Sequence, residues 1–357
     1  MNVKDIANLR LASQRVARTK FDSPKQLVAW MGAMQAQDQA MVKWAVGLRL
    51  LDSTEKVIEA AMDRGDIIRT HVLRSTWHIV SSDDLGWMLA QTAPRIQAGM
   101  RSRYKELELT EAVLSQSRKV MERTLRDGNH STREELIAAL NKANIKTDEN
   151  RASHLLVAAE LDGLICSGAI KNGKQTYALL EERVPRRKSL NRDQALASLA
   201  NRYFSSRGPA TLDDFNWWSG LSFGDAKRAL EMIQSDLASE TIEGNIYWYA
   251  EENVKSKSLA FLLPAFDEFI ISYKNRSATI TFENHKRAIS NNGMFHPTIV
   301  FDGETVGIWK RIIKKDEASL DLSYFVAPTP AMQKKVEAAI NQYVEFLGKK
   351  PGLITKK

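Results

Sequence analysis

The 357-residue chain contains a single cysteine, Cys166, which excludes an internal disulfide and any zinc site built from cysteine ligands. No segment approaches the roughly 18 uninterrupted apolar residues that a membrane-spanning helix requires. The first residues, MNVKDIANLRLASQRV, are amphipathic and charged and lack the apolar core of a signal peptide. We therefore expect a cytoplasmic protein.

The standard catalytic sequence patterns are also missing. The chain has no Walker phosphate-binding loop, no Gly-x-Ser-x-Gly nucleophile elbow and no His-Glu-x-x-His zinc helix. Its six histidines are scattered, except that His71 and His78 fall in one predicted hairpin. On an unbroken strand they would point to opposite faces, whereas a turn near Leu73 would bring them together. A hydrogen-bonded structural histidine is favoured over a metal ligand, and we predict neither a metal nor a cofactor.

What the chain does have is the composition of a soluble globular protein, with 43% hydrophobic and 26% charged residues. Its length is sufficient for two to four domains. The net charge of +8 favours a polyanionic partner, because clustered lysine and arginine attract phosphate backbones.

A helix–helix–hairpin pattern is clearest in the middle of the chain. The segment HSTREELIAALNKANI starts with a capping box, Ser131 with Glu134 three residues on. A second helix follows in ENRASHLLVAAELDGLICSG, and Asn172 and Gly173 then lie between short alternating runs, which is a strong hairpin signal. Two helices followed by a β-hairpin are the order of a winged helix.

The same order recurs in residues 195–250. Thr211 is the predicted N-cap of a helix, with Asp214 three residues on, and that helix ends at Gly220. The segment SFGDAKRALEMIQSDL is the second helix, and SETIEGNIYWYAE indicates a wing that turns near Gly244 and Asn245. This segment predicts another winged helix.

The N-terminal copy of the pattern is looser. Ser23 is a predicted N-cap, Pro24 occupies the first helical position and Gln26 closes the box. STEKVIEAAMDRG supplies the second helix, and DIIRTHVLRSTWHIV supplies the hairpin. Because order and spacing agree three times, we predict three tandem winged helices.

The last hundred residues alternate like strands and turn at Asp302 and Gly303, before an amphipathic helix in TPAMQKKVEAAINQYVEFLG. A small β-barrel or curled sheet with a terminal helix fits this pattern, so the predicted fold class is α+β. The basic segment EERVPRRKSLNR is the predicted linker, either a solvated connector or a phosphate-contacting strap. The predicted domains are winged helix 1 with the glutamine motif at 1–105, winged helix 2 at 106–186, winged helix 3 at 187–258, and the β-barrel with its terminal helix at 259–357.

Two glutamines interrupt the otherwise apolar segment WMGAMQAQDQAMVKW. On a helix, Gln35 and Gln37 would lie about 200° apart and could not share a site. If the helix continues, one is exposed and the other is a satisfied polar group at the edge of the core. If the helix ends near Met34 to Ala36, both amides can face one cavity, with Ala36 packed inside. We favour the second arrangement because the apolar stripe stops here.

The segments GAMQAQDQAMVKWAVGLRL, IIRTHVLRSTWHIVSSDDLGWML, RYFSSRGPATLDDFNWWSGL, LLPAFDEFIISYKNR and NGMFHPTIVFDGETVGIWKR span nearly the whole chain. In this order they resemble the winged-helix DNA glycosylases typified by AlkZ and YcaQ. The resemblance implies three tandem winged helices and a C-terminal β-barrel, arranged as a C-shaped clamp around DNA. It also implies removal of bulky N-alkylated purines and, in some members, the unhooking of interstrand crosslinks.

The resemblance places the catalytic signature of that family at Gln35-Ala36-Gln37. This is the AlkZ-like variant, which lacks the carboxylate of the YcaQ-like branch, and Ser75 stands where many relatives have proline. Our hypothesis assigns the nucleophilic water to Gln37 and the sugar or base edge to Gln35. Asp38 is the second-ranked candidate for a catalytic carboxylate.

Two amides are sufficient only for a substrate that is already activated. A purine alkylated at N7 or N3 carries a positive charge and leaves readily, so the enzyme must expose the nucleotide, stabilise positive charge and hold the water. Amide oxygens can perform the last two tasks, and each amide has two donors that fix its orientation. We therefore expect little excision of neutral bases, no metal requirement and no Schiff-base lyase step.

The hairpin supplies further candidates. Strand alternation predicts Arg69 and His71 on one face, with Thr76 or His78 beside them and Trp77 opposite. Cleft residues beside the glutamines would be His71 and His78. The alternative is that Trp77 belongs to the core and the arginines to a solvated face. Predicted DNA contacts are Arg69, Arg74, Thr76, Trp77, Lys274, Arg276, Lys310 and Arg311, whereas Asp267 is expected to order the barrel through hydrogen bonds.

We thus predict a monomeric, monofunctional DNA glycosylase that acts on double-stranded DNA carrying bulky N7- or N3-alkylated purines. The main alternative is a non-enzymatic winged-helix DNA-binding protein or transcriptional regulator. A third class, a protein-interaction scaffold, would show no salt-dependent affinity for DNA.

Overall fold

The computed structural model describes residues 2–184, 189–250 and 259–356. The chain forms two compact units, Met1–Ile58 with Ala197–Lys357, and Glu59–Leu196. We refer to them as the discontinuous unit and the middle unit. The fold mixes helices and strands, which confirms the predicted α+β class.

The middle unit contains the second copy of the predicted pattern. Asn172 and Gly173 both have positive φ, 54° and 75°, as the predicted two-residue hairpin turn requires. Strands β4 and β5 both pair with β6, giving the sheet order β4-β6-β5. The elements of this pattern, in chain order, are α6 (Glu111–Leu125), β4 (Ser131–Thr132), α7 (Arg133–Lys142), α8 (Arg151–Leu161), β5 (Ile165–Ser167) and β6 (Thr176–Leu179).

The capping box of α7 lies one residue later than predicted. The N-cap is Thr132, whose hydroxyl accepts from the backbone N–H of Glu135, and the Glu135 carboxylate accepts from the N–H of Thr132. The prediction of Ser131 with Glu134 was wrong, because HSTREE contains two overlapping matches to the motif. Ser131 instead belongs to β4, where it pairs with Tyr177.

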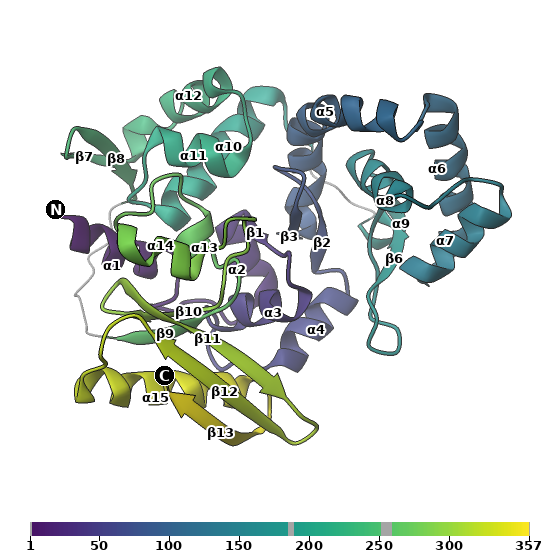
Figure 1. Cartoon of the computed structure of the whole chain (residues 1–357). Coiled ribbons are helices and arrows are strands. Elements are labelled where there is room, and N and C mark those ends of the chain that lie inside the picture. The colour runs from purple at the N-terminus through teal and green to yellow at the C-terminus, as the bar shows by residue number, and fades with distance from the viewer. Residues whose placement is uncertain (1, 185–188, 251–258, 357) are drawn as a thin grey trace. The chain divides into compact units, whose positions relative to one another are not determined.

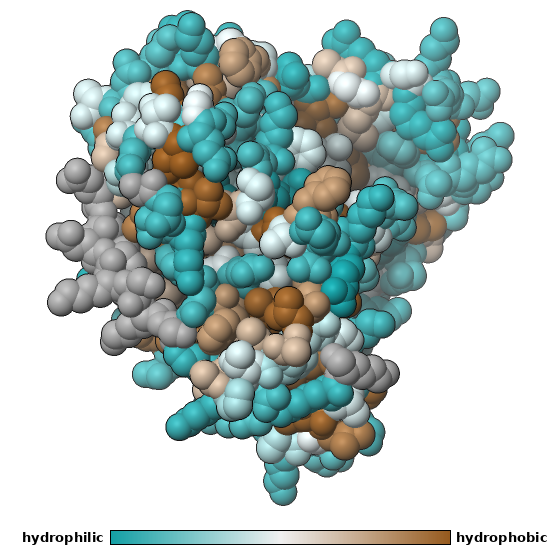
Figure 2. All heavy atoms as spheres, turned by 60° about the vertical axis from the view of Figure 1, so that its left-hand side comes forward, coloured by the Kyte–Doolittle hydropathy of each residue, from teal (hydrophilic) through white to brown (hydrophobic). Residues whose placement is uncertain are grey.

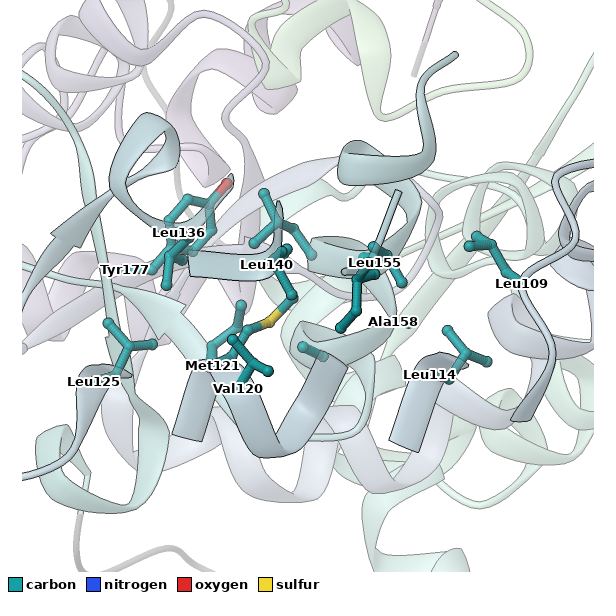
Figure 3. Packing of buried hydrophobic residues seen from close by; sticks show 14 of the residues in the cluster. Leu109, Leu114, Val120, Met121, Leu125, Leu136, Leu140, Leu155, Ala158 and Tyr177 are labelled. Carbon is teal, nitrogen blue, oxygen red and sulfur yellow. The ribbon is translucent and has the colours of Figure 1, made fainter. Parts of the chain in front are cut away.

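The core of the middle unit is aliphatic (Figure 3). Side chains from α6, α7 and α8 meet over the sheet, with Tyr177 of β6 beside them. Trp77 packs against the edge of this cluster and is partly buried. It belongs to a hairpin formed by β2 (Ile67–His71) and β3 (Trp77–Ser81), which is followed by the long helix α5 (Ser82–Glu106); the short helix α9 (Leu180–Arg183) comes after β6.

The first residues of the discontinuous unit form α1 (Val3–Ser13), α2 (Pro24–Met31), β1 (Ala33–Gln35) and α3 (Gln39–Gly47). Ser23 is the N-cap of α2 and Pro24 its first residue, as predicted. Helix α4 (Glu55–Asp63), the predicted second helix, contains the boundary between the two units.

The third copy of the pattern consists of α10 (Arg192–Arg207), α11 (Leu212–Ser219), α12 (Phe223–Glu231), η1 (Gln234–Asp236), β7 (Ala238–Ile242) and β8 (Asn245–Tyr249). The predicted capping box of Thr211 with Asp214 is confirmed. Gly220 ends α11 in the left-handed conformation that glycine adopts at little cost.

The C-terminal part is an open five-stranded sheet in the order β13-β12-β11-β10-β9, visible at the yellow-green end of the chain in Figure 1. Among the described residues β13 and β9 are its two edges, so the sheet does not close into the predicted barrel. The elements are β9 (Ala260–Leu263), α13 (Glu268–Ile271), α14 (Phe282–Ala288), β10 (Thr298–Phe301), β11 (Glu304–Ile313), β12 (Glu317–Tyr324), α15 (Pro330–Phe346) and β13 (Lys350–Lys356).

Trp44 joins α3 to this sheet and its helix. The indole N–H donates to the carbonyl of Leu262 on β9 at 2.7 Å. Its ring lies 5.1 Å from that of Tyr343 and 5.0 Å from that of Phe346, both on α15. The segment after the glutamine motif is thereby fixed to the C-terminal sheet.

The face drawn in Figure 2 is mostly hydrophilic, and its hydrophobic residues are divided among several small patches. None of the helices within residues 2–184, 189–250 and 259–356 has the length and apolar character needed to cross a membrane.

Candidate active site

The glutamine motif lies outside a helix. Helix α2 ends at Met31, Gly32 is its C-cap with φ 72°, and the chain then forms the short strand β1 up to Gln35. The helix therefore ends before both glutamines, as the second arrangement requires, and its last residue lies three positions before Met34. The glycine permits this reversal because a positive φ costs it little.

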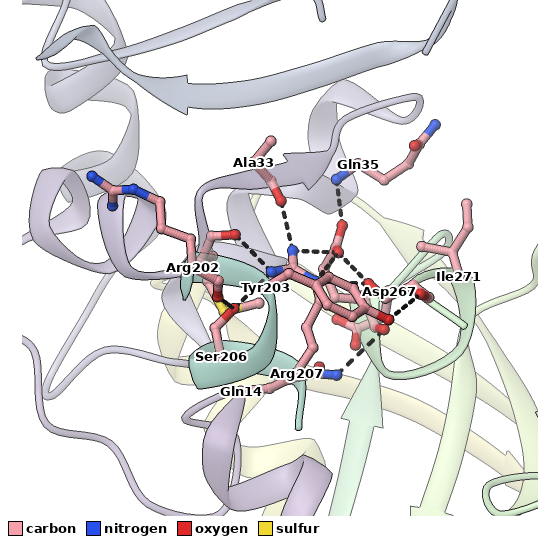
Figure 4. A network of polar contacts seen from close by, with 12 residues as sticks. Gln14, Ala33, Gln35, Arg202, Tyr203, Ser206, Arg207, Asp267 and Ile271 are labelled. Atoms are coloured by element: carbon pink, nitrogen blue, oxygen red, sulfur yellow. Dashed lines mark hydrogen bonds and ion pairs between the residues drawn. The ribbon is translucent and has the colours of Figure 1, made fainter. Parts of the chain in front are cut away.

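The two glutamines differ in exposure. Gln35 is only 5% exposed and Ala36 is fully buried, whereas Gln37 is exposed. In Figure 4 the side chain of Gln35 extends away from the polar network beneath it, and its backbone N–H points into that network. The motif thus has a buried first glutamine, an alanine anchored in the core as expected, and a solvent-facing second glutamine.

Asp38 is the N-cap of α3. One of its carboxylate oxygens accepts from the backbone N–H groups of Ala40 and Met41, at 2.9 and 3.0 Å. An N-cap carboxylate satisfies amide groups that would otherwise have no partner at the start of the helix. This cap gives Asp38 a structural function.

A buried ion pair lies against the motif. The guanidinium of Arg207, from the end of α10, is 2.6 Å from the carboxylate of Glu268, the first residue of α13. Arg207 also donates to the carbonyls of Met31 and Ala33, at 2.6 Å each. The other oxygen of Glu268 accepts from the backbone N–H of Gln35 at 2.6 Å. One ion pair therefore binds backbone groups from the end of α2 to the first glutamine.

Glu268 is ionised in this network. Burial raises the pKa of its carboxyl, but the charge of Arg207, the hydroxyl of Ser272 and the N–H of Gln35 outweigh burial and leave the pKa below its ordinary value. The carboxylate therefore keeps its negative charge at neutral pH, and the pair carries no net charge beneath the motif.

A second ion pair joins Arg49 to Asp267, the residue immediately before Glu268. The Arg49 guanidinium binds both carboxylate oxygens of Asp267, at 2.8 and 2.9 Å, and donates to the carbonyls of Gln14 and Ala45. Asp267 also accepts from the N–H of Phe269 at the start of α13. These bonds link Arg49 to the start of α13, whereas Asp267 was expected to order a β-barrel, which the open sheet does not form.

The hairpin differs from its predicted arrangement in one respect. His71 pairs with Trp77 across the strands, and Thr70 pairs with His78. Directly opposed residues share a face, so Trp77 lies with His71 and not opposite it. Their rings are 4.2 Å apart, and the Arg69 guanidinium lies 3.9 Å from the Trp77 ring. His71 and His78 point to opposite faces, because the residue opposite His71 is Trp77.

His71 also contacts a buried carboxylate that sequence analysis did not identify. Its Nδ1 makes a short contact with Glu160 of α8, which is fully buried. Burial raises the pKa of Glu160 above its ordinary value, although the hydrogen bond and charge of His71 oppose this shift. Arg69 is buried as well and donates to Gln175. These contacts give Arg69, His71 and Trp77 packing roles within the middle unit, and their contact with DNA stays a prediction.

The other residues predicted to contact DNA differ in their exposure and in their partners. Lys274 and Lys310 are exposed, and the Lys274 ammonium is 3.5 Å from Asp213. Arg276 donates to the carbonyl of Ile270, and Arg311 donates to the hydroxyl of Tyr343. Lys310 and Arg311 are adjacent on β11, so their side chains leave opposite faces of the sheet.

The remaining hairpin candidates, Arg74 and Thr76, lie in the partly buried turn, and His78 contacts the carbonyl of Thr76 through Nδ1 at 3.0 Å. In the predicted linker, residues 185–188 fall outside the described residues.

The comparison with protein families gives the class of the protein. Residues 28–346 match the family described as DNA glycosylase AlkZ-like. The chain therefore belongs to the AlkZ-like DNA glycosylases, and the predicted enzyme class, a DNA glycosylase that acts on DNA, is confirmed.

Two matches come from one organism. The interstrand DNA cross-link repair glycosylase of Streptomyces sahachiroi is 22% identical over 358 residues, covering 93% of this chain and 91% of the relative. The solved structure of Streptomyces sahachiroi DNA glycosylase AlkZ matches with a TM-score of 0.84 and 18% identity, over 100% of both chains. At this identity the structural match establishes the shared fold.

Proposed function

We propose that this protein is a monofunctional DNA glycosylase that hydrolyses the N-glycosidic bond of N7- or N3-alkylated purines in double-stranded DNA. The observation that carries the proposal is the Gln35-Ala36-Gln37 segment, which leaves a helix, buries its alanine and exposes Gln37. We further propose that the protein acts as a monomer, and that its helix–helix–hairpin repeats are winged helices that bind the DNA.

The chemistry of the motif defines the substrate class. The acidic group next to the motif, Asp38, uses one carboxylate oxygen to cap α3, and we assign the chemistry to the amide dipoles of the motif itself. When the C1′–N bond breaks, its electron pair returns to the purine ring and cancels the positive charge. The amide oxygen of Gln37 orients water toward C1′, the water oxygen forms the new bond, and its proton passes to solvent. Gln35 contacts the sugar or base edge.

The named relative extends the proposal to crosslinks. That relative is an interstrand cross-link repair glycosylase. A crosslink attached through purine N7 presents the same cationic leaving base, so the same bond cleavage would release one strand. We therefore include such crosslinks in the proposed substrate class.

The test is single-turnover release of 7-methylguanine from a duplex by the wild type and by Gln37→Ala. Loss of a group that is preorganised for the transition state typically lowers the rate by about 100- to 1,000-fold. Gln39→Ala is the matched control, because Gln39 is a third glutamine in the same segment but is the first residue of α3. We expect Gln39→Ala to retain the wild-type rate. Equal rates for Gln37→Ala and Gln39→Ala would contradict the assignment.

A further inference from the structure

The backbone that leads to the first glutamine bends directly after a helix end. Helix α2 ends at Met31, and the next four residues pass through the left-handed Gly32 into a three-residue strand. A helix end leaves carbonyl groups without intrahelical partners, and a buried backbone group needs a partner from elsewhere. At this bend the Arg207–Glu268 pair binds the carbonyls of Met31 and Ala33 and the N–H of Gln35.

The Arg207–Glu268 pair is buried and hydrogen-bonded to its surroundings. Arg207 is fully buried and Glu268 is 2% exposed. Ser272 donates its hydroxyl to Glu268 and accepts from Arg207 Nε at 2.9 Å, and the guanidinium lies 4.5 Å from the Trp218 ring. Burial and these partners leave the two side chains little freedom to move, and Figure 4 shows Arg207 bound to the backbone of Ala33.

We propose that Arg207 and Glu268 are positioning residues for the glycosylase reaction, which hold the backbone from Met31 to Gln35 so that the Gln35 amide is presented to the substrate. This inference rests on the proposed function of the motif. The pair contacts the motif only through backbone groups, and the Gln35 side chain extends away from it, so neither residue touches the DNA. The pair acts by fixing the position of the motif. A misplacement of about 1 Å at a reacting centre can lower the rate roughly 100-fold.

The chain contains a matched control for this proposal. Arg49 is also fully buried, and it binds the carboxylate of Asp267, the neighbour of Glu268. It also donates to two backbone carbonyls, but these belong to Gln14 and Ala45 and not to the motif. Lysine at either position keeps the charge but cannot supply the several donors of a guanidinium. Arg207→Lys and Arg49→Lys therefore remove similar buried contacts, and only the first reaches the motif.

The experiment measures single-turnover release of 7-methylguanine and affinity for an undamaged duplex, below the melting temperature of every variant. We expect Arg207→Lys to lower the release rate by about 100-fold and to change the dissociation constant by less than about threefold. Arg49→Lys should keep the rate within about threefold of wild type. Equal slowing by both substitutions would overturn the proposal, because it would indicate a general effect of lost buried contacts.

A double substitution tests whether the effect passes through Gln35. In a Gln35→Ala background, Arg207→Lys should cause little further loss, since residues that act as a unit are not additive. Full additivity would overturn the positioning role. If Gln35→Ala and Gln37→Ala both excise at the wild-type rate, the proposed function of the motif is wrong. If both glutamine variants are slow but Arg207→Lys excises at the wild-type rate, only the positioning proposal is wrong.

If Arg207→Lys does not fold, Ser272→Ala is the test, because it removes one hydrogen bond to each member of the pair. The release rate should then fall by at least about fivefold, the effect of losing one of these two hydrogen bonds, with duplex affinity unchanged. An unchanged rate in a folded Ser272→Ala protein would count against the proposal.

Discussion

Glu160 is a fully buried carboxyl with only one of its two oxygens hydrogen-bonded within the part of the chain that the structure describes. One carboxylate oxygen contacts His71, and the other has no hydrogen-bond partner among the described residues. Desolvation disfavours the ionised form, which is why burial raises the pKa of this carboxyl. Because the folded state holds the proton more tightly than the unfolded state, stability falls as the pH rises from the ordinary glutamate pKa through the raised value.

Glu160→Gln should remove this pH dependence. Glutamine keeps an oxygen that can accept from the His71 ring, but it has no charge to bury. We expect the variant to be more stable than wild type above the Glu160 pKa, by about 1 kcal/mol or more, and to lose that advantage in acid. Urea denaturation at a series of pH values measures the difference.

The control for this substitution is Glu106→Gln, which removes a carboxylate whose side chain is 58% exposed in the same unit. Glu106→Gln should leave the slope of stability against pH close to that of wild type. A Glu160→Gln protein with the same slope as Glu106→Gln would show that Glu160 does not titrate differently in the folded and unfolded states.

At the same scale, the sequence predicts the two glutamines of the motif but not the residues that hold them in place. The resemblance identifies Gln35 and Gln37 from a local pattern. Glu268 is 233 residues away from Gln35, and no local pattern predicts a hydrogen bond between them. Arg207 lies at the end of an amphipathic helix, where an arginine is normally solvated, and only the tertiary structure shows that it is buried.

Helix starts and hairpin turns are the elements that the sequence predicts well. Thr211 with Asp214 and the turn at Asn172 and Gly173 are fixed by local chemistry and occur where predicted. Strand β13 was missed because it pairs parallel to β12 across an intervening helix, a contact between distant segments. The same limit explains why the predicted barrel is an open sheet, because closure depends on which strand edges meet and not on the sequence of any one strand.

The shifted capping box of α7 gives a prediction at the scale of the element. Thr132→Ala should destabilise the protein by about 1 kcal/mol, because it leaves the Glu135 N–H without its partner. Ser131→Ala, one residue earlier, should cost clearly less, since Ser131 belongs to β4 and does not cap the helix. Thermal or urea unfolding of the two variants measures the difference, and a larger loss in Ser131→Ala would contradict the assigned cap.

For the whole molecule, the net charge of +8 predicts how DNA affinity responds to salt. Each phosphate neutralised by lysine or arginine releases a counterion, so affinity falls with salt concentration. We expect the dissociation constant for an undamaged duplex to rise at least about tenfold between 50 and 200 mM salt, the value for two phosphate contacts. Fluorescence anisotropy measures it, and an affinity indifferent to salt would contradict a phosphate-binding surface.

The discontinuity of the unit that contains the motif has a consequence for synthesis of the protein. The ribosome completes Gln35 long before Glu268, and at about 5–20 residues per second the interval is tens of seconds. During that time the Arg207–Glu268 pair cannot form, so the carbonyls of Met31 and Ala33 and the N–H of Gln35 lack the hydrogen bonds that this pair supplies. A chain terminated before residue 268 would therefore contain both glutamines but lack the buried carboxylate that binds the first of them.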